Sequence, residues 1–280
     1  MITDVVQRWF RGRDSYRSAR EFVDTSKLEV SVITSDRVAR DFVVEQHYSR
    51  SFPAARFRYG LHEKGGALVG VAVFSVPSNT LALAPLPGPS AEDVVDGKKK
   101  FDPRVELGRF VLLNRIGANA ESWFLARCFA ELRSSGIIGV VSFSDPFPRT
   151  TAAGSVIFAG HVGCAYQASN AVYLGQARPD TVRLLPDGRT LHNRSLAKLR
   201  AQDRGWRYVL DELVGYGAEP PANGETVSDW LGTWMPQLVR QSRKPGNHKY
   251  VWALDRSLRR MLPASLPYPK FHLQNLRGAA

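Results

Sequence analysis

Apolar and polar residues alternate through the first quarter of the chain in a way that predicts three strands. Residues 28–34 form the first strand, and residues 56–63 and 67–76 form a hairpin that turns at residues 64–66, Lys-Gly-Gly. Between the first strand and the hairpin, apolar residues recur at helical spacing, which predicts a helix from residue 35 or 36 to about residue 47. The pattern therefore predicts a strand, a helix and a hairpin in this order.

A strand, a helix and a further strand are predicted in the middle of the chain. Residues 104–113 predict the first strand and residues 114–118 a turn. A helix follows from about Asn119, whose side-chain oxygen is able to cap it. Gly136 is suited to end this helix in the left-handed conformation, and the apolar run 137–143 predicts a strand that is covered on both faces.

The rest of the pattern up to about residue 180 fits one mixed sheet. Residues 77–103 hold several prolines and little periodicity, which predicts a long loop. Residues 147–168 predict a loop and a short helix, and residues 171–175 predict another strand. We therefore expect an α/β (α+β) fold, in which helices cover both faces of a mixed central sheet.

The last hundred residues follow a different pattern, which is mainly helical. A turn at residues 184–189 precedes a basic helix predicted over residues 195–208. Residues 217–225 are rich in Gly, Pro and Asn and predict a linker, and a helix that carries tryptophan is predicted at about residues 226–240.

Charge separates the same regions. The net charge is +12, from 38 Lys and Arg against 26 Asp and Glu. Residues 1–180 hold 22 basic and 18 acidic side chains, whereas residues 181–280 hold 16 and 8, so the excess is concentrated in the last third. A basic region of this kind indicates an anionic partner, most often nucleic acid; the alternative is a solvated basic surface without a partner.

Together these patterns predict three parts of the chain. Residues 1–27 are polar and rich in Arg, with an amphipathic pattern around Val5, Trp9 and Phe10, and predict an N-terminal arm or an extra helix. Residues 28–180 form the expected main domain. Residues 181–280 form a basic extension that we expect to pack on this domain and to contact a nucleic acid.

The sequence suggests a protein of the cytoplasm. It shows neither a secretory signal nor an apolar run of membrane-spanning length, so we expect no membrane association. Its two cysteines, Cys128 and Cys164, have neither metal-binding nor redox spacing, and are expected to be reduced thiols.

A set of short motifs occurs in a fixed order over about residues 40–255. They are EQHYS at 45–49, GVAVF at 70–74, ELGR at 106–109, NAESWF at 119–124, VSFSDP at 141–146, YQASN at 166–170 with YLG at 173–175, and PGNHKYVW at 245–252. This series resembles the Mom family, phage enzymes that add a methylcarbamoyl group to the N6 of adenine in DNA and are similar in fold to GNAT-type acyltransferases. The resemblance implies a GNAT-like catalytic domain at residues 28–180.

The GNAT-like fold carries an expectation about a cofactor. In that fold two central strands splay apart, the pantetheine arm of acyl-CoA lies in the gap, and its pyrophosphate rests on the turn before the helix. The resemblance thus assigns acyl-CoA binding to Arg115, Gly117, Asn119 and Ser122. The usual motif is Gln/Arg-x-x-Gly-x-Gly/Ala, and this chain has alanine at both of the small positions that follow Arg115. The sequence does not identify the group donor.

The resemblance implies a transferase that modifies the exocyclic N6 amine of adenine in phage DNA and so protects the DNA from host restriction. The amine is a poor nucleophile, so the reaction requires a polarised electrophile and a group that removes a proton. In a duplex the base also has to leave the stack. The expected partners are double-stranded DNA with a flipped adenine and a small-molecule group donor.

Three charged residues near the two middle strands are candidates for this chemistry. Asp145 follows a buried strand and is the first choice for the proton acceptor; its alternative role is that of an Asp-Pro turn residue. Arg109 is a candidate to stabilise an oxyanion. Glu106 is a second candidate carboxylate. At a separation of three residues on a regular strand, Glu106 and Arg109 are expected on opposite faces, which argues against a simple ion pair.

Polar and aromatic residues on neighbouring elements complete the candidate catalytic set. His47 is able to act on the base or to interact with the dipole of the helix that it ends, and Tyr48 is able to stack on a base. Tyr166 lies where GNAT-type enzymes often carry a tyrosine acid, although core packing is an equal explanation. Ser122 is either a donor to the cofactor or acyl group, or an ordinary residue of the helix start.

Substrate binding is assigned to turn residues and to the basic tail. Ser169 and Asn170 either contact the base or cofactor, or belong to a turn. The basic candidates for DNA contact are Lys198, Arg200, Arg204, Arg243, Lys244, His248 and Lys249. The residue spacing does not indicate structural zinc, and it leaves open a mononuclear iron site that uses His47 and nearby carboxylates.

Two other functions fit the same sequence. One is a GNAT-like acyltransferase that acts on a small molecule or a protein. The other is a DNA-binding protein without catalysis on this fold.

Overall fold

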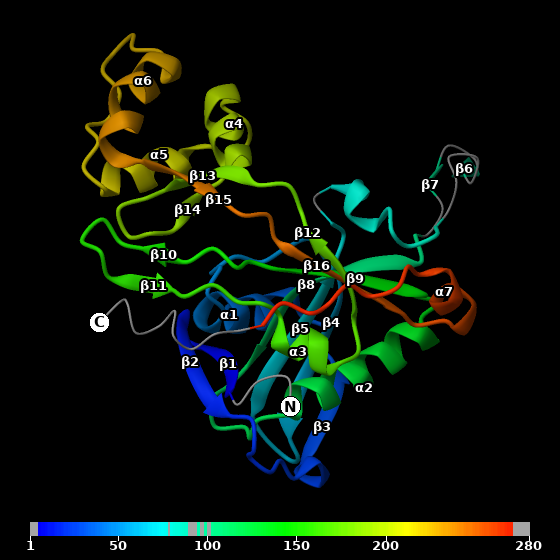
Figure 1. Ribbon diagram of the computed structural model, residues 1–280. Coiled ribbons are helices and arrows are strands. Elements are labelled where there is room, and N and C mark those ends of the chain that lie inside the picture. Colours follow the sequence, from blue (N-terminus) through cyan, green and yellow to red (C-terminus); the bar gives the residue numbers. More distant parts are fainter. Residues whose placement is uncertain (1–4, 78, 89–93, 96–97, 100–101, 271–280) are drawn as a thin grey trace. The chain divides into compact units, whose positions relative to one another are not determined.

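The computed structural model describes residues 5–77, 79–88, 94–95, 98–99 and 102–270 of the 280-residue chain. The chain forms two compact units (Figure 1). Within the described residues, the sheet unit comprises residues 5–146, 161–177 and 247–270, and the helical unit comprises residues 147–160 and 178–246. Residues 247–270 return to the sheet unit, whereas the division of the chain at residues 27 and 180 stays a prediction.

A seven-stranded mixed sheet forms the centre of the sheet unit, with strand order β12-β16-β9-β8-β5-β4-β3. Its strands are β3 (Leu28–Val32), β4 (Ala55–Glu63), β5 (Leu68–Ser75), β8 (Arg104–Leu112), β9 (Gly139–Ser144), β12 (Val172–Gln176) and β16 (His248–Ala253). Only β8 and β9 pair in parallel. The strands predicted up to residue 175 are confirmed, whereas β16 lies in the segment that was expected to be a helical extension.

Helices cover both faces of this sheet. They are α1 (Asp36–Gln46), α2 (Ala120–Ser134), the short α3 (Cys164–Ala168) and α7 (Arg256–Met261). On β5, Ala72 and Phe74 pack in one core with Phe124 of α2. Since side chains alternate along a strand, Val71 and Val73 point to the other face, where α1 contacts β4, β5 and β8. The predicted arrangement of a mixed sheet between helices is confirmed.

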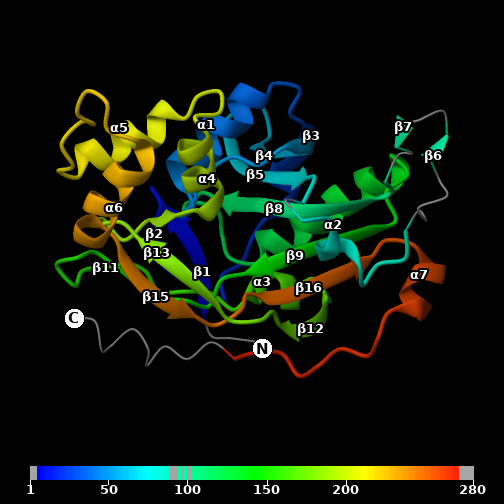
Figure 2. The same ribbon diagram turned by 90° about the horizontal axis from the view of Figure 1, so that it is seen from above.

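The N-terminal residues form a β-hairpin, not the expected arm or helix. Strands β1 (Val5–Phe10) and β2 (Arg13–Ser18) pair in an antiparallel manner, and the 3-10 turn η1 (Thr25–Lys27) leads into β3. β1 contacts both β8 and α3, and Figures 1 and 2 both show it beside α3. The Trp9 side chain is buried there, so the amphipathic pattern at the chain start belongs to a strand.

The two parallel strands in the middle of the sheet separate along their length. Pairing between β8 and β9 runs from Arg104 to Glu106, opposite Gly139 to Val141. β8 continues to Leu112 and β9 to Ser144, beyond the paired segment. Ser142 Oγ donates a hydrogen bond to the Leu107 carbonyl at 2.9 Å, where the separation starts. This is the splay that the GNAT-like fold implies.

β8 also contains a bulge within this separated segment. Phe74 of β5 pairs with Leu107, but the preceding Val73 pairs with Arg109, so Gly108 is an additional residue. A Cβ atom at position 108 would lie 2.6 Å from Ser75 Oγ, which explains the glycine. The bulge changes the alternation of side chains along β8 and so determines which residues share a face.

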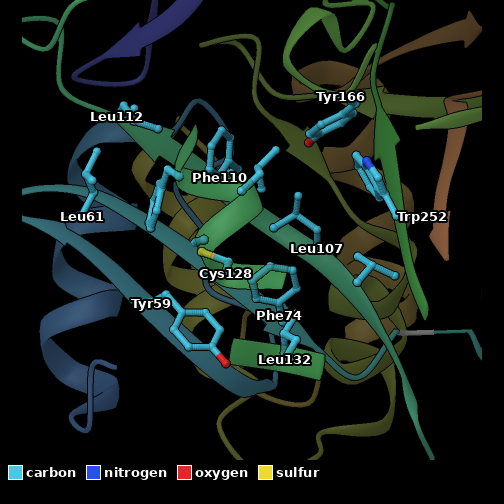
Figure 3. Packing of buried hydrophobic residues seen from close by; sticks show 14 of the residues in the cluster. Tyr59, Leu61, Phe74, Leu107, Phe110, Leu112, Cys128, Leu132, Tyr166 and Trp252 are labelled. Atoms are coloured by element: carbon cyan, nitrogen blue, oxygen red, sulfur yellow. The ribbon is translucent and has the colours of Figure 1, made fainter. Parts of the chain in front are cut away.

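The core of the sheet unit packs between the sheet and α2. Its fully buried members include Phe74, Phe124, Leu125 and Cys128. Cys128 is thus a packing residue. Figure 3 shows Tyr166 of α3 on the side of Leu107 away from Tyr59.

The loop that connects β5 and β8 contains short elements. They are the 3-10 helix η2 (Thr80–Leu83) and the paired strands β6 (Val94–Val95) and β7 (Lys98–Lys99). Parts of the predicted loop at residues 77–103 lie outside the described residues.

The helical unit has its own core. It contains the short strands β10 (Arg149–Thr150), β11 (Val156–Phe158), β13 (Asp180–Leu184), β14 (Thr190–Leu191) and β15 (Arg240–Lys244), and the helices α4 (Asn193–Ala201), α5 (Arg207–Gly215) and α6 (Val227–Leu238). Trp230 of α6 is fully buried among leucines from α4 and α5. The prediction of one helix over residues 195–208 is wrong, because Gln202 (φ 50°) and Gly205 (φ 77°) adopt left-handed conformations and separate α4 from α5.

Candidate functional site

Two charged side chains share one face of β8 at the point where β8 and β9 separate. The bulge at Gly108 places Glu106 and Arg109 on the same face, and their charges affect one another. The expectation that they lie on opposite faces is therefore wrong, because it assumed a regular strand. We call Glu106, Arg109 and Tyr166 the splay cluster.

Arg109 is held in place by the loop after α1. Its Nε donates to the Ser51 carbonyl at 2.8 Å, and its Nη2 donates to Ser51 Oγ at 2.6 Å. Its Nη1 donates to the Gly108 carbonyl at 2.5 Å. Burial lowers the pKa of the guanidinium, although the nearby Tyr48, Glu106 and Tyr166 act in the opposite direction. The cation is thus fixed in a partly desolvated environment, where electrostatic interactions are stronger than in water.

Glu106 and Tyr166 complete the cluster. Burial raises the pKa of the Glu106 carboxyl, and the neighbouring Arg109 offsets this effect only in part. Burial also raises the pKa of the Tyr166 hydroxyl, which interacts with Ser142 and with both charged side chains. A carboxyl with a raised pKa is a stronger base than a free glutamate. A tyrosine with a raised pKa keeps its proton at neutral pH and is able to donate a hydrogen bond.

Aromatic rings from three segments gather beside this cluster. The rings of His47 and Tyr48 are stacked with their centroids 4.3 Å apart, and Trp9 of β1 meets Tyr48 edge-on at 4.6 Å. His161 meets Trp9 at 5.4 Å, and its Nε2 lies 3.4 Å from the Tyr48 hydroxyl. The electrostatic influence of Tyr48 on Arg109 links these rings to the splay cluster. We call Trp9, His47, Tyr48 and His161 the aromatic cluster.

The protonation of His47 follows from its local hydrogen bonds. Its Nδ1 accepts the Ser49 backbone N–H at 3.1 Å and lies 2.9 Å from Ser49 Oγ. An Nδ1 that accepts an N–H carries no proton, so the neutral ring holds its proton on Nε2. The sequence placed His47 at the end of a helix, and it is indeed the C-terminal cap of α1.

The turn before α2, expected to hold a cofactor, has a different environment. Arg115 pairs with Glu63 at 2.7 Å on an exposed surface. Asn119 has a left-handed backbone, and its side chain donates to the Ala19 carbonyl at 3.0 Å without capping α2. Ser122 Oγ donates to the Asn119 carbonyl at 3.2 Å. These partners all belong to the chain itself.

Comparison with known proteins agrees with this architecture. The model of the Mom protein family matches residues 27–270. The chain belongs to the Mom family. The resemblance seen in the sequence is thus confirmed, and membership associates the chain with phage DNA modification, with transferase activity and with DNA as a substrate.

A solved tandem GNAT protein from the clavulanic acid biosynthesis pathway, without AcCoA, is similar to this Mom family member at 10% identity and a TM-score of 0.38. The similarity covers 81% of this chain and 99% of that one. No curated protein matches the sequence.

Asp145, the first choice for a proton acceptor in this Mom family member, lies half-buried directly after β9. Its carbonyl accepts the His161 backbone N–H at 2.8 Å, which fixes the segment that carries a ring of the aromatic cluster. The hydrogen bonds of Arg109 go to Ser51 and Gly108, and the carboxylate that affects its pKa is Glu106. The roles of Asp145 and Glu106 both stay predictions.

The residues expected to contact DNA or base occupy varied positions. Ser169 Oγ donates to the Ala165 carbonyl at 2.7 Å, and Asn170 has a left-handed backbone, as expected of turn residues. His248 lies inside the sheet unit with its Nδ1 2.7 Å from the Tyr173 hydroxyl, so it is not part of a basic surface. Lys249 is half-buried over the ring of Phe143.

The helical unit contains five of the basic residues that were expected to contact DNA. Arg200, Arg204 and Arg243 are exposed, whereas Lys198 and Lys244 are half-buried. Lys198 lies over the ring of Tyr208 with 5.6 Å to the ring centroid.

Sequence reasoning missed several residues of the site. Trp9 was seen only as part of an amphipathic pattern, and His161 stands alone in a segment without periodicity. Ser51 and Ser142 carry no signal, because a single serine is common in any loop or strand. The EQHYS and ELGR motifs were the usable signal, since they contain four members of the two clusters, namely His47, Tyr48, Glu106 and Arg109.

The described residues contain neither a candidate metal-binding group nor a candidate membrane span. No three His, Cys, Asp or Glu side chains among them gather closely enough to hold a metal ion. None of the helices in the described part of the chain has the length and apolar character needed to cross a membrane.

Proposed function

We propose that this chain transfers a methylcarbamoyl-type group to the exocyclic N6 amine of adenine in phage DNA and so protects the DNA from host restriction. The observation that carries the proposal is the convergence of Glu106, Arg109 and Tyr166 at the splay of the central strands, beside a stack of aromatic rings. Membership of the Mom family supports DNA as the substrate.

The splay cluster contains the three functions that the transfer needs. The N6 nitrogen attacks the carbonyl carbon of an activated donor, which forms an N–C bond, and the bond between that carbon and its leaving group breaks. Glu106 accepts the proton that N6 loses, since a raised pKa makes it a stronger base. Arg109 stabilises the developing oxyanion, and Tyr166 supplies a proton to the leaving group.

The aromatic cluster offers a surface for an unstacked purine. The energetic cost of extruding a base is offset when the flipped base stacks on aromatic rings and its edge finds hydrogen-bond partners. Tyr48 is half-buried and presents such a ring near Arg109, and the buried His47 ring stacks against it. We propose that they hold the adenine while its amine faces Glu106.

The exposed arginines of the helical unit bind the phosphate backbone of DNA, which does not depend on the base sequence. Each phosphate that Arg200, Arg204 or Arg243 neutralises would release counterions, so the affinity should fall steeply as the salt concentration rises. Replacement of Arg204 by Gln should reduce the slope of log affinity against log salt by about 1.

The proposal is tested by nucleoside mass spectrometry of plasmid DNA from cells that express the chain. We expect a heavier deoxyadenosine species, and its mass would identify the added group. Glu106→Gln should abolish it, and comparison with Asp145→Ala would decide which carboxylate accepts the proton. An unchanged nucleoside profile from a folded protein that binds DNA would argue for the alternative of a DNA-binding protein without catalysis.

A further inference from the structure

The turn between β8 and α2 is the place where a GNAT-like fold would hold the pyrophosphate of acyl-CoA, so we asked whether its residues fit that group. The answer depends on which N–H donors and carbonyl acceptors the turn leaves for a ligand. Its Ala118 N–H, at the start of α2, is the type of donor that such a phosphate requires.

That donor is already used by a carboxylate of the same chain. The Ala118 N–H donates to Glu21 Oε2 at 3.0 Å. Glu21 is held by Arg17, whose Nε lies 2.7 Å from the same oxygen. The hydrogen bonds and these charges lower the pKa of Glu21, so the group is an anion at neutral pH. An anion therefore stands at the helix start where the phosphate would be.

The carbonyl groups of the turn are occupied by the N-terminal hairpin. Arg8 of β1 donates to the carbonyls of Leu113 (3.0 Å), Ile116 and Gly117 (2.9 Å). The Arg8 Nε also binds Glu121 of α2 at 2.6 Å, and both side chains are almost fully buried. Arg17 donates to the carbonyl of Asn114. Groups from residues 8–21 thus occupy four carbonyls of the turn and the Ala118 N–H.

The close approach of the two segments leaves no space between them. A Cβ atom at Gly117 would lie 2.7 Å from the Phe22 carbonyl oxygen. Only glycine allows the segment after the hairpin to lie against the turn in this way. The glycine of the partial cofactor motif therefore serves contact with the chain itself.

The hairpin also lies along one of the two splayed strands. β1 contacts β8 and α3, and it reaches Tyr48 and His161 through Trp9. In the GNAT-like arrangement the pantetheine arm lies between the two strands that separate, which are β8 and β9 in this chain. The hairpin thus places Glu21 where the phosphate would lie and packs β1 against a strand that would border the arm.

We infer that the turn before α2 is a closed anion site, and that the group donor is not a coenzyme A thioester held in the usual way of this fold. The donor belongs instead to molecules without a nucleotide diphosphate, which bind at Arg109. This inference restricts the chemical class of the group donor. It rests on the proposed function only in that the proposed function names the reaction that the donor serves. Its tests measure binding and need no DNA.

The first test uses coenzyme A and acetyl-CoA with the full chain, followed by calorimetry and by hydrogen exchange. We expect no saturable binding at millimolar concentration and unchanged exchange in residues 5–22 and 114–122. Saturable binding that protects residues 114–122 and releases residues 5–22 would overturn the inference, because the hairpin would then be a displaceable cover.

The second test opens the site. In Glu21→Ala the Ala118 N–H loses its carboxylate, so inorganic pyrophosphate should raise the melting temperature of this variant but not of the wild type. Glu21→Gln is the matched control, because its amide oxygen still fills the position and accepts the N–H; pyrophosphate should leave it unchanged. An equal increase in all three proteins would contradict a closed site in the wild type.

Discussion

Two polar regions lie at the two ends of the separated segment of β8, and they differ in how far hydrogen-bond and ion-pair partners favour the charged form of their groups. At the turn before α2, Arg8, Arg17 and Glu21 supply partners for the backbone and for Glu121. At the bulge, Glu106 and Arg109 are partly buried with pKa values shifted against their charged forms. The groups at the turn stabilise the fold, whereas the groups at the bulge have the shifted pKa values that are typical of reacting residues. A polar cluster at the position where a fold usually binds its cofactor therefore does not by itself identify the reacting centre.

The largest effect on stability is expected at the turn. Arg8→Met should lower the free energy of unfolding by about 3–5 kcal/mol, since Glu121 would remain buried without its cation. The measurement is urea unfolding followed by tryptophan fluorescence.

The double variant Arg8→Met, Glu121→Leu provides the control for this prediction. It removes both charges and should recover much of the loss. Equal unfolding midpoints for the wild type and Arg8→Met would show that the buried pair does not stabilise the hairpin on the sheet.

The largest effect on activity is expected at the bulge. Arg109→Met should lower the rate of DNA modification on the order of 10²–10³-fold, the usual effect of removing an oxyanion-stabilising group. The unfolding midpoint should change little, because the cost of partly desolvating the guanidinium in the folded state offsets the stability gained from its hydrogen bonds. The rate is measured as modified deoxyadenosine over time.

Arg115→Met is the matched control, because Arg115 pairs with Glu63 on an exposed surface at the other region. We expect unchanged activity and an unchanged unfolding midpoint. Comparable losses in the two variants would mean that positive charge in general, and not the position of Arg109, supports the reaction.

A smaller effect should follow from a change in the bulge itself. Gly108→Ala adds a Cβ that meets Ser75 Oγ at 2.6 Å, so we expect a loss of about 1–3 kcal/mol together with reduced activity. Ser75→Ala in the same chain removes the clash and should restore both. Activity that survives Gly108→Ala would show that the bulge does not position Arg109.

The smallest effect concerns pH. Because burial raises the pKa of Glu106 in the folded state, its stabilising contribution is present at low pH and is lost as the pH rises through the folded pKa. Glu106→Gln should therefore gain stability relative to the wild type between acidic and neutral pH. Melting temperatures of both proteins over this range provide the measurement, and parallel curves would contradict the shifted pKa.

The contrast between the two regions also explains what the sequence could predict. Hydrophobic periodicity located the strands and helices around both regions, because each local pattern agrees with its buried face. The strand β16 was missed, since residues 248–253 follow a basic segment and join the sheet only through long-range pairing.

The sequence predicted which residues belong to the candidate site, but it did not predict which of them share a face of the sheet. The motifs indicated Glu106, Arg109, His47, Tyr48 and Tyr166, which the fold brings together. A bulge depends on tertiary contacts such as that of Gly108 with Ser75, so the shared face of Glu106 and Arg109 could not be seen. The hairpin on the turn was equally hidden, because Arg8 and Glu21 act about a hundred residues away from their partners.

The most direct test of the account compares one charge from each region in the same assay. The amount of modified deoxyadenosine per folded molecule is measured for Arg109→Met and for Glu21→Ala. We expect almost no modified deoxyadenosine with Arg109→Met, and an amount of modified deoxyadenosine near that of the wild type with Glu21→Ala. The opposite result, with modification lost in Glu21→Ala and kept in Arg109→Met, would place the reaction at the turn and contradict the assignment of the splay cluster.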